Sequence, residues 1–444
     1  MGGRVLDLNR RDFLKTGALA SAAVGLTLSG IGREAEALPR IEGLWTGVPI
    51  MQGMTDAESA QFRVLVDLAS PVHYEVRDPH GTLVPVKILD RFVHPSVPGT
   101  SVDHLIATGL KPGVDYRLFV LDEAQGNARD ERVFTSFDLA SAAVRFALIS
   151  CMNDRYPGRH GAMWRAVEQS NPDFIFFVGD ACYADQRSEG GEGGTWKRHL
   201  ETRRLLDVFR WQRLKPILAT WDDHDFGVNN GDGTFALKNA TKQLFEAMFG
   251  SLPMGARSLG PGVSSVVEIS GQRFFFMDDR SERNLDDLSG HWGSTQEEWF
   301  FSKLHESEKP AWVMNGSQFF GGPWSKEAFN SRHSGQLDRV IKRLRDASAP
   351  VAFASGDVHF SEVIRLEPEL IGYETYELTS SSIHSISIPG FHRIYRNPRR
   401  ENATSWYNFM IVESRAEGAS LQANVRCLGA GDTFFKRDLR IRRG

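Results

Sequence analysis

The stretch best equipped for chemistry is residues 221–227, Trp-Asp-Asp-His-Asp-Phe-Gly. Three carboxylates and an imidazole follow directly on the apolar run 217–220 and are framed by Trp221 and Phe226. Carboxylates crowded among aromatic side chains repel one another unless a cation or a proton neutralises them. We expect a bound metal ion, because a solvated surface loop would rarely be framed by two large aromatic residues.

Two other segments have the same form, an apolar run that ends in ionisable groups. The run 174–178 leads to Asp180, and the run 351–355 leads to Asp357 and His359. Short, continuous apolar runs are typical of strands covered on both faces. Open α/β folds bind ligands at the carboxyl ends of such strands. We therefore expect the three strand ends to meet at one metal centre.

Strands and helices are predicted to alternate from residue 144 onward, which indicates α/β architecture with helices outside central sheets. The glycine-rich segment 190–194 is predicted to be neither helix nor strand, and is either a mobile loop beside the site or a plain connector. Residues 406–441 return to strand-like alternation and are expected to complete a second sheet. The expected strands are 146–150, 173–178, 216–220, 274–277, 312–314 and 351–355, and the expected helices are 161–169, 196–210, 237–249, 296–304 and 335–346.

Residues 43–137 predict an antiparallel β module. Phe62, Val64 and Val66 alternate with polar or differently facing residues, which is typical of half-buried strands. The segment 110–116 is typical of the tyrosine corner of immunoglobulin-like and fibronectin type III sandwiches. We see no ligand set in this module and expect a structural role, such as covering one edge of the α/β domain. Carbohydrate or partner binding is the weaker alternative.

The first 37 residues predict a twin-arginine export signal. Asn-Arg-Arg-Asp-Phe-Leu-Lys at 9–15 precedes a weakly apolar run, 16–31, and a small-x-small site predicts cleavage after Ala37. An amphipathic helix of the folded domain is the alternative, but four glycines interrupt the segment. The partner is then the twin-arginine machinery, which carries folded proteins, and the destination is the periplasm or the exterior. No stable membrane anchor is expected after cleavage.

The amino-acid composition excludes several classes of protein. The chain has 444 residues, of which 41% are hydrophobic and 24% charged, the profile of a soluble globular protein. A formal net charge of −4 argues against a nucleic-acid-binding surface. Three cysteines, Cys151, Cys182 and Cys427, are too few for a disulfide framework.

The positions of the acidic and histidine residues along the sequence suggest different roles for them. Asp357 and His359 would share one face of a strand end, because strand side chains have a period of two, and both could reach one metal or two adjacent metals. Asp223 and His224 are neighbours that point differently, so we assign Asp223 to the metal and His224 to the substrate. Asp180 could bridge two cations; capping of the next helix is the alternative.

Other side chains are assigned from their chemistry. Cys151 is a candidate thiolate ligand, although a lone cysteine is commonly a small buried hydrophobe. Tyr183 as a phenolate needs a strongly acidic cation, because an unperturbed tyrosine has a pKa of about 10. We expect Cys182 to point away from the metal and Cys427 to lie in the core. Asp222 and Asp225 are expected to orient the imidazole and the ligands.

Four further residues have weaker assignments. Asn315 and Gln318 are possible metal or substrate ligands, and hydrogen bonds to the backbone are an equal alternative. Arg280 and Arg283 could be surface arginines. Because the guanidinium fork suits phosphate oxygens, we place one of them at the substrate.

Taken in order, these groups resemble the calcineurin-like metallophosphoesterases, whose blocks run D-x-H, G-D-x-x-D, G-N-H-[DE], a histidine and G-H-x-H. The chain departs from that pattern at four positions. Cys151 and Tyr183 stand where two Asp residues would be, Asp223 replaces Asn, and Asp357 replaces the first His of G-H-x-H. These departures resemble the alkaline phosphatase D (PhoD) family, as do the export signal, the β module and the segments 277–283 and 377–381.

The resemblance implies a four-layer α/β/β/α metallophosphoesterase sandwich with an N-terminal immunoglobulin- or fibronectin III-like domain. The implied parts are a signal peptide at 1–37, a β-sandwich at 38–140 and a catalytic domain at 141–444. The implied activity is hydrolysis of phosphate monoesters, diesters or both. The family's metals imply Fe3+ held by Cys151, Asp180, Tyr183 and His359, and Ca2+ at sites that include Asp223 and Asp357. Thiolate and phenolate ligands suit iron, and clustered carboxylates suit calcium.

Within this reading His224 protonates the leaving group or holds its oxygen. Two alternatives from other classes stay open. A hydrolase that uses Zn2+ at a carbon centre would share the carboxylates and histidines but would not need the arginines. A non-catalytic surface-adhesion protein would rely on the β module, with a degenerate domain behind it.

Overall fold

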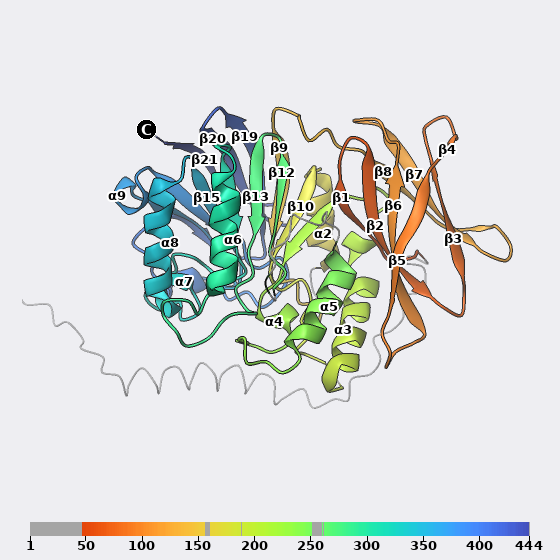
Figure 1. Cartoon of the computed structure of the whole chain (residues 1–444), viewed down its shortest axis with the longest axis horizontal. Coiled ribbons are helices and arrows are strands. Elements are labelled where there is room, and N and C mark those ends of the chain that lie inside the picture. Colours follow the sequence, from red (N-terminus) through yellow and green to blue (C-terminus); the bar gives the residue numbers. More distant parts are fainter. Residues whose placement is uncertain (1–46, 156–159, 188, 251–259, 261, 444) are drawn as a thin grey trace, which may run out of the picture. The chain divides into compact units, whose positions relative to one another are not determined.

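The computed structural model describes residues 47–443 except 156–159, 188, 251–259 and 261. The predicted signal peptide and its cleavage site lie outside the described residues. Within the described part, no helix is both long and apolar enough to cross a membrane. The described chain forms four β-sheets and a set of helices (Figure 1).

Residues 50–135 form two four-stranded antiparallel sheets, with strand orders β1-β2-β6-β5 and β4-β3-β7-β8. Inward side chains of both sheets share one apolar core, in which Phe62 packs edge to face on Phe134 at 4.8 Å. The Tyr116 hydroxyl accepts a hydrogen bond from the Lys111 N–H (2.9 Å), as predicted for a tyrosine corner. The strands are β1 Ile50–Thr55, β2 Ser59–Asp67, β3 Val72–Arg77, β4 Leu83–Val84, β5 Val86–Val93, β6 Thr100–Thr108, β7 Asp115–Asp122 and β8 Ala128–Thr135.

The rest of the described chain is built on two mixed sheets, which confirms the α/β class. One has six strands in the order β11-β10-β9-β19-β20-β21, and the other has seven in the order β12-β13-β14-β15-β17-β16-β18. β9, β10 and β11 run parallel in the six-stranded sheet, and β13, β14, β15 and β17 run parallel in the seven-stranded sheet. The remaining strands of both sheets pair antiparallel with their neighbours. The strands are β9 Val144–Ile149, β10 Phe174–Val178, β11 Ile217–Thr220, β12 Ser265–Ile269, β13 Gln272–Phe276, β14 Ala311–Met314, β15 Val351–Ser355, β16 Ser361–Leu366, β17 Thr375–Thr379, β18 Arg400–Thr404, β19 Phe409–Glu417, β20 Ser420–Leu428 and β21 Thr433–Arg442.

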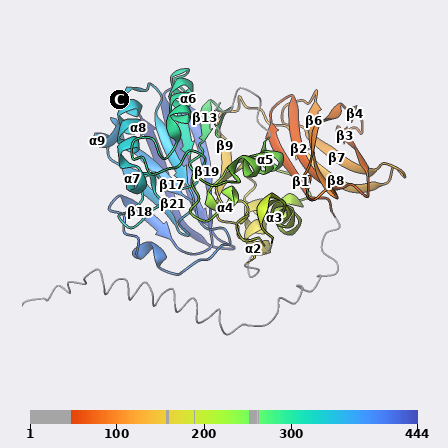
Figure 2. The same ribbon diagram turned by 60° about the horizontal axis from the view of Figure 1, so that its bottom comes forward.

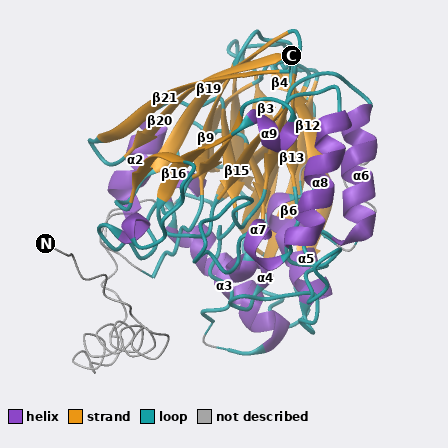
Figure 3. Cartoon of the chain, turned by 90° about the vertical axis from the view of Figure 1, so that its left-hand side faces the viewer, coloured by secondary structure: helices purple, strands orange, loops and turns teal. Residues whose placement is uncertain are grey.

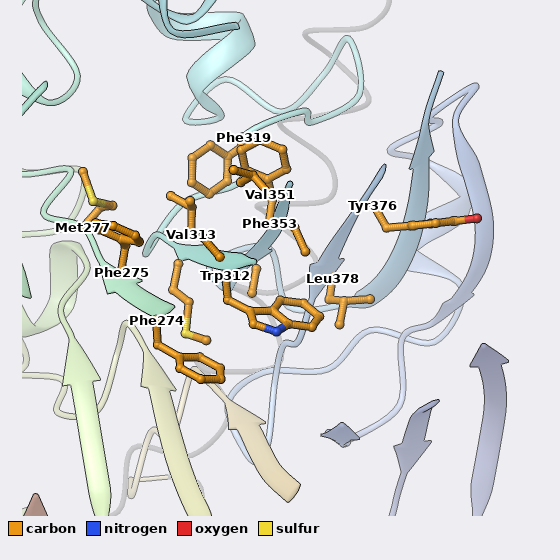
Figure 4. Close-up of a cluster of buried hydrophobic side chains, with 14 of the residues drawn as sticks. Phe274, Phe275, Met277, Trp312, Val313, Phe319, Val351, Phe353, Tyr376 and Leu378 are labelled. Atoms are coloured by element: carbon orange, nitrogen blue, oxygen red, sulfur yellow. The ribbon is translucent and has the colours of Figure 1, made fainter. Parts of the chain in front are cut away.

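The two mixed sheets pack face to face through large aromatic side chains. Phe146 on β9 lies 5.6 Å, between ring centroids, from both Phe274 on β13 and Trp312 on β14. Phe275, the next residue along β13, points to the opposite face and packs on Phe300. Burial on both faces explains why these strands are continuous apolar runs instead of alternating ones. Figure 4 shows Phe274, Phe275 and Trp312 within this core.

Helices cover the outer face of each mixed sheet. α6 and α8 lie side by side on the seven-stranded sheet (Figure 3), and Arg339 and Arg343 of α8 pair with Glu297 and Glu298 of α6. On the six-stranded sheet, Trp164 of α2 and Phe249 of α5 both pack on Phe177. The helices are α2 His160–Gln169, α3 Gly191–Leu205, α4 Asp223–Phe226, α5 Lys238–Phe249, α6 Gly293–His305, α7 Phe329–Arg332, α8 Ser334–Asp346 and α9 Pro368–Ile371.

The N-terminal sheets contact the segment that precedes β11, an edge strand of the six-stranded sheet. The Val133 N–H donates to the Gln212 carbonyl, and the Leu214 N–H donates back to the Val133 carbonyl, both at 2.8 Å. Gln52 on β1 forms a parallel bridge with Pro216. Backbone groups near this edge are therefore paired by the β module.

The predicted strands and helices are present, with ends shifted by a few residues. The prediction for 190–194 was wrong, because α3 begins at Gly191 and these glycines form its first turn. Burial of Trp196, His199 and Leu200 stabilises this helix despite its poor local propensity. Glu192 adds a carboxylate in the first turn, where the helix dipole favours negative charge.

Candidate metal centre

The polar residues after four strands of the two mixed sheets converge. Cys151 follows β9, Asp180 follows β10, Asp223 follows β11 at the start of α4, and His359 follows β15. Ligand atoms of Cys151, Asp180 and His359 all lie within 4.8 Å of one another, and so do those of Asp180, Asp223 and His224. Asp180 belongs to both groups. This is the placement that a carboxylate bridging two cations requires.

Cys151 and Tyr183 lie at the first of these groups. The Cys151 thiol donates to Asp180 Oδ2 (3.3 Å). The Tyr183 hydroxyl oxygen lies 3.5 Å from Asp180 Oδ2 and 3.5 Å from His359 Nε2. A thiol, a phenol, a carboxylate and an imidazole thus converge from residues that the sequence analysis had singled out.

The backbone at these residues is strained. Among the described residues, seven other than glycine have positive φ, and four of them are Cys151 (55°), Asp180 (55°), Asp357 (71°) and His359 (57°). Each such conformation costs about 1–3 kcal/mol and persists only where the surrounding structure enforces it. The concentration of this strain at one place is typical of a functional site.

Asp357 and His359 reach the site differently from the prediction. β15 ends at Ser355, so the two residues follow the strand and do not share its period of two. The positive φ at both positions turns the chain there. His359 belongs to the first group of donors, and both Asp357 and His359 line the cleft.

The site opens into a cleft of about 460 Å³. Cys151 and Tyr183 are buried beneath it. Lys326 and Glu327 add one positive and one negative side chain to its wall. The lining residues are Asp180, Asp223, His224, Asn229, Asn230, Trp324, Ser325, Lys326, Glu327, Asp357, Val358, His359, Phe391 and Tyr395.

Burial favours the protonated form of several acidic groups at this site, although Arg280 and His224 lower the pKa of Asp223. Burial raises the pKa of Asp180 to about 8; His224 opposes this shift and Asp223 adds to it. Burial, with Asp223 as the next cause, raises the pKa of Asp357 to about 7. Burial and the Asp180 charge also raise the pKa values of Cys151 and Tyr183. This donor set fits a cation that would take the place of these protons.

His224 is oriented by a carboxylate that the sequence analysis missed. Asp185 Oδ1 lies 2.9 Å from His224 Nδ1, and the imidazole stacks on the Tyr183 ring with centroids 4.0 Å apart. Burial alone would lower the pKa of His224, but Asp180, Asp185 and Asp223 together raise it to about 10. Asp185 stands five residues after Asp180, and this proximity to the motif is the signal that could have revealed it.

Asp222 and Asp225 were expected to orient the imidazole and the ligands; Asp225 supports a ligand-bearing turn, whereas Asp222 pairs with an arginine. The Asp225 carboxylate accepts the backbone N–H groups of Ala181 (3.1 Å) and Cys182 (2.7 Å), so it fixes the turn that carries Asp180. Asp222 pairs with the Arg280 guanidinium at 2.5 Å. α4, which begins directly after Asp222 and contains Asp225, lies beside α5 (Figure 2).

The placement of an arginine at the substrate needs correction. Arg280 and Arg283 are 0% and 1% exposed and are not among the described residues that line the cleft. Both donate to Glu327 Oε2, Arg280 at 3.2 Å and Arg283 at 2.5 Å. Their charge is balanced by buried carboxylates, and it is Glu327 that faces the cleft.

Asn315 and Gln318 also lie away from the donor groups. Asn315 Nδ2 donates to Asp279 Oδ2 (3.1 Å), and Gln318 Nε2 donates to Glu362 Oε1 (2.8 Å). Neither lines the cleft among the described residues, so the structure does not bring them to a metal. Cys182 lies 3.5 Å from Thr202 Oγ1 on α3 and Cys427 is in the core, both as expected.

Comparisons with known proteins bear mainly on export. Residues 7–27 match the model of the TAT (twin-arginine translocation) pathway signal sequence. The chain is therefore exported by the twin-arginine route, to the periplasm or the exterior. A search of curated proteins gave no match.

Among solved structures, amylomaltase from Corynebacterium glutamicum matches at 12% identity and a TM-score of 0.16. That match covers 39% of this chain and only 25% of the amylomaltase. A similarity this low carries no argument about fold or activity.

Proposed function

We propose that this exported protein is a metal-dependent phosphoesterase of the alkaline phosphatase D type, acting on phosphate monoesters, diesters or both. In this proposal residues 141–444 form the four-layer metallophosphoesterase sandwich, and residues 38–140 form an immunoglobulin- or fibronectin III-like domain. The observation that carries the proposal is the position of Asp180. Its carboxylate is shared by two donor groups whose residues follow β9, β10, β11 and β15.

The donor atoms suggest which cations the two groups would hold. Cys151, Asp180, Tyr183 and His359 offer thiolate, carboxylate, phenolate and imidazole, a set suited to Fe3+. Asp223 and Asp357 offer hard carboxylate oxygens suited to Ca2+. Such cations, when bound, neutralise the charge on phosphate oxygens and polarise the phosphorus–oxygen bond.

His224 is assigned the transfer of a proton to the leaving group. Asp185 engages its Nδ1, which leaves Nε2 as the ring nitrogen that can donate to a leaving-group oxygen. Stacking on Tyr183 fixes the plane of the ring. With both constraints, the imidazole is held in one orientation at the cleft, as a proton donor requires.

Metal analysis and turnover of p-nitrophenyl phosphate and its bis ester test this proposal together. Iron and calcium with turnover of either ester would support it. Zinc with activity on carboxylic esters, and none on phosphate esters, would favour a hydrolase acting at carbon. Absence of both metal and turnover in the exported, folded protein would favour a non-catalytic binding protein.

A further inference from the structure

The cleft carries aromatic side chains as well as carboxylates. Trp324, Phe391 and Tyr395 line the same cleft as Asp180 and His224. Trp324 is 54% exposed, and the other two rings are half-buried. Large rings usually gain free energy by burial in the core, so three accessible rings at one cleft indicate a binding surface.

These rings come from two chain segments that pack tightly on each other. Trp324 lies between β14 and α7, while Phe391 and Tyr395 lie between β17 and β18. The Asn397 side chain donates to the Phe320 carbonyl (2.8 Å), which ties the second segment to the first. A Cβ on Gly322 would collide with the Arg396 carbonyl, so the two backbones are in direct contact there. The rings therefore sit on one supported wall.

The cleft combines two kinds of side chain whose chemistry is complementary. Asp180, Asp223 and His224 are the groups to which the proposed function assigns the phosphoryl centre. Aromatic side chains stack on planar rings and bind them more favourably than saturated groups of equal size. Lys326, beside Trp324, is the one Lys or Arg among the described residues that line the cleft, and its charge suits an anionic ester.

We propose that the cleft takes phosphate esters that bear a planar aromatic group, an aryl or nucleobase ring, and that Trp324 selects for that ring. This inference rests on the proposed phosphoesterase function and names the substrate class of the same site. Trp324 is a specificity-determining residue here and takes no part in the bond cleavage.

The chain offers a matched control. Trp406 is also 54% exposed but does not line the cleft. Replacement of each tryptophan by alanine removes the same amount of side chain from a solvent-exposed position. A difference between Trp324→Ala and Trp406→Ala therefore reports on the cleft and not on general loss of exposed aromatic surface.

Two diesters whose second ester group is methyl isolate the effect of planarity: benzyl methyl phosphate and cyclohexylmethyl methyl phosphate, with turnover followed by chromatography of the released alcohol. We expect Trp324→Ala to lower kcat/KM for the benzyl ester roughly tenfold, mainly through KM, because one stacking contact is lost. The cyclohexylmethyl ester should change by less than about twofold, and Trp406→Ala should alter neither. Equal losses on both esters, or no loss on the benzyl ester, would overturn the inference.

Failure of the phosphoesterase proposal would give a different result from failure of the aromatic-selection inference. Wild-type protein that turns over neither diester nor p-nitrophenyl phosphate would reject the phosphoesterase assignment. The inference is then judged by calorimetric titration with benzylphosphonate and cyclohexylmethylphosphonate. Tighter binding of the benzyl compound that disappears in Trp324→Ala would support aromatic selection, and equal affinities would overturn it.

Discussion

Asp185 Oδ1 lies 2.9 Å from His224 Nδ1, so the imidazole at the cleft is held by a carboxylate outside the donor groups. A carboxylate on one ring nitrogen fixes the tautomer and the orientation of the other. This pairing gives His224 the arrangement of an oriented proton donor, and it leads directly to the first prediction.

We expect His224→Ala to retain its metals and to lose kcat by about 10²–10⁴-fold, the usual contribution of a general acid. Asp185→Asn should retain the imidazole but hold it less firmly, with a smaller loss of kcat and a shifted alkaline limb in the pH–rate profile. Metal analysis and pH–rate profiles of both variants test this. A His224→Ala protein without metal would instead make His224 a ligand.

Asp180→Ala should lose bound metal together with activity, because one carboxylate serves both donor groups. Asp173→Ala is a suitable control, since Asp173 precedes the same strand, β10, at its opposite end. Elemental analysis of the purified wild-type and variant proteins measures the bound metal. A metal content equal to that of the wild type would rule out the bridging role.

Tyr183 and Cys151 together distinguish iron from zinc. Phenolate and thiolate bound to Fe3+ absorb visible light, whereas Zn2+ has a filled d shell and would leave the protein colourless. We predict a coloured protein whose visible band shifts or fades in Tyr183→Phe and in Cys151→Ser. Reductants should bleach it, and chelation of calcium should abolish turnover while leaving most of the band.

The neighbouring thiol provides the control for this experiment. Cys182 faces Thr202 on α3, so Cys182→Ser should leave the spectrum unchanged. A colourless, fully active protein that contains zinc would reject iron while leaving the phosphoesterase proposal intact.

We expect the buried imidazole of His199, on α3, to make the folded protein less stable in acid. Burial, together with the Arg203 and Arg198 charges, lowers the pKa of His199 to about 3, so the folded state holds it neutral. In the unfolded state the imidazole takes up a proton below a pH of about 6.5. The free energy of unfolding therefore falls as the pH drops from about 6.5 toward 3. From this group alone the free energy of unfolding should fall by about 2 kcal/mol at pH 5.

His199→Leu should remove that part of the acid sensitivity, because leucine does not titrate. Urea unfolding at pH 8 and at pH 5, in wild type and variant, measures it. An identical pH dependence in the two proteins would show that another group is responsible. His73, on β3, is largely exposed and supplies the control substitution.

The α/β class, most strand positions and the convergence of the candidate donors at 151, 180, 183, 223 and 359 could be predicted from the amino-acid sequence. Strands buried on both faces are typically continuous apolar runs, and open α/β folds bind ligands at the carboxyl ends of such strands, so these features can be predicted locally. The tyrosine corner was predictable for the same reason, since its hydrogen bond spans only five residues.

Which charged groups are paired and which remain available could not be predicted, because the partners lie far apart in the sequence. Arg280 and Arg283 look suited to phosphate in the sequence, but Asp222 and Glu327, distant along the chain, neutralise them. The glycines of 190–194 become helical because Trp196 and Leu200 are buried by partners far away in sequence. The aromatic wall of Trp324, Phe391 and Tyr395 likewise exists only because two loops pack together. Charge pairing, burial and loop packing depend on long-range contacts, which local sequence does not encode.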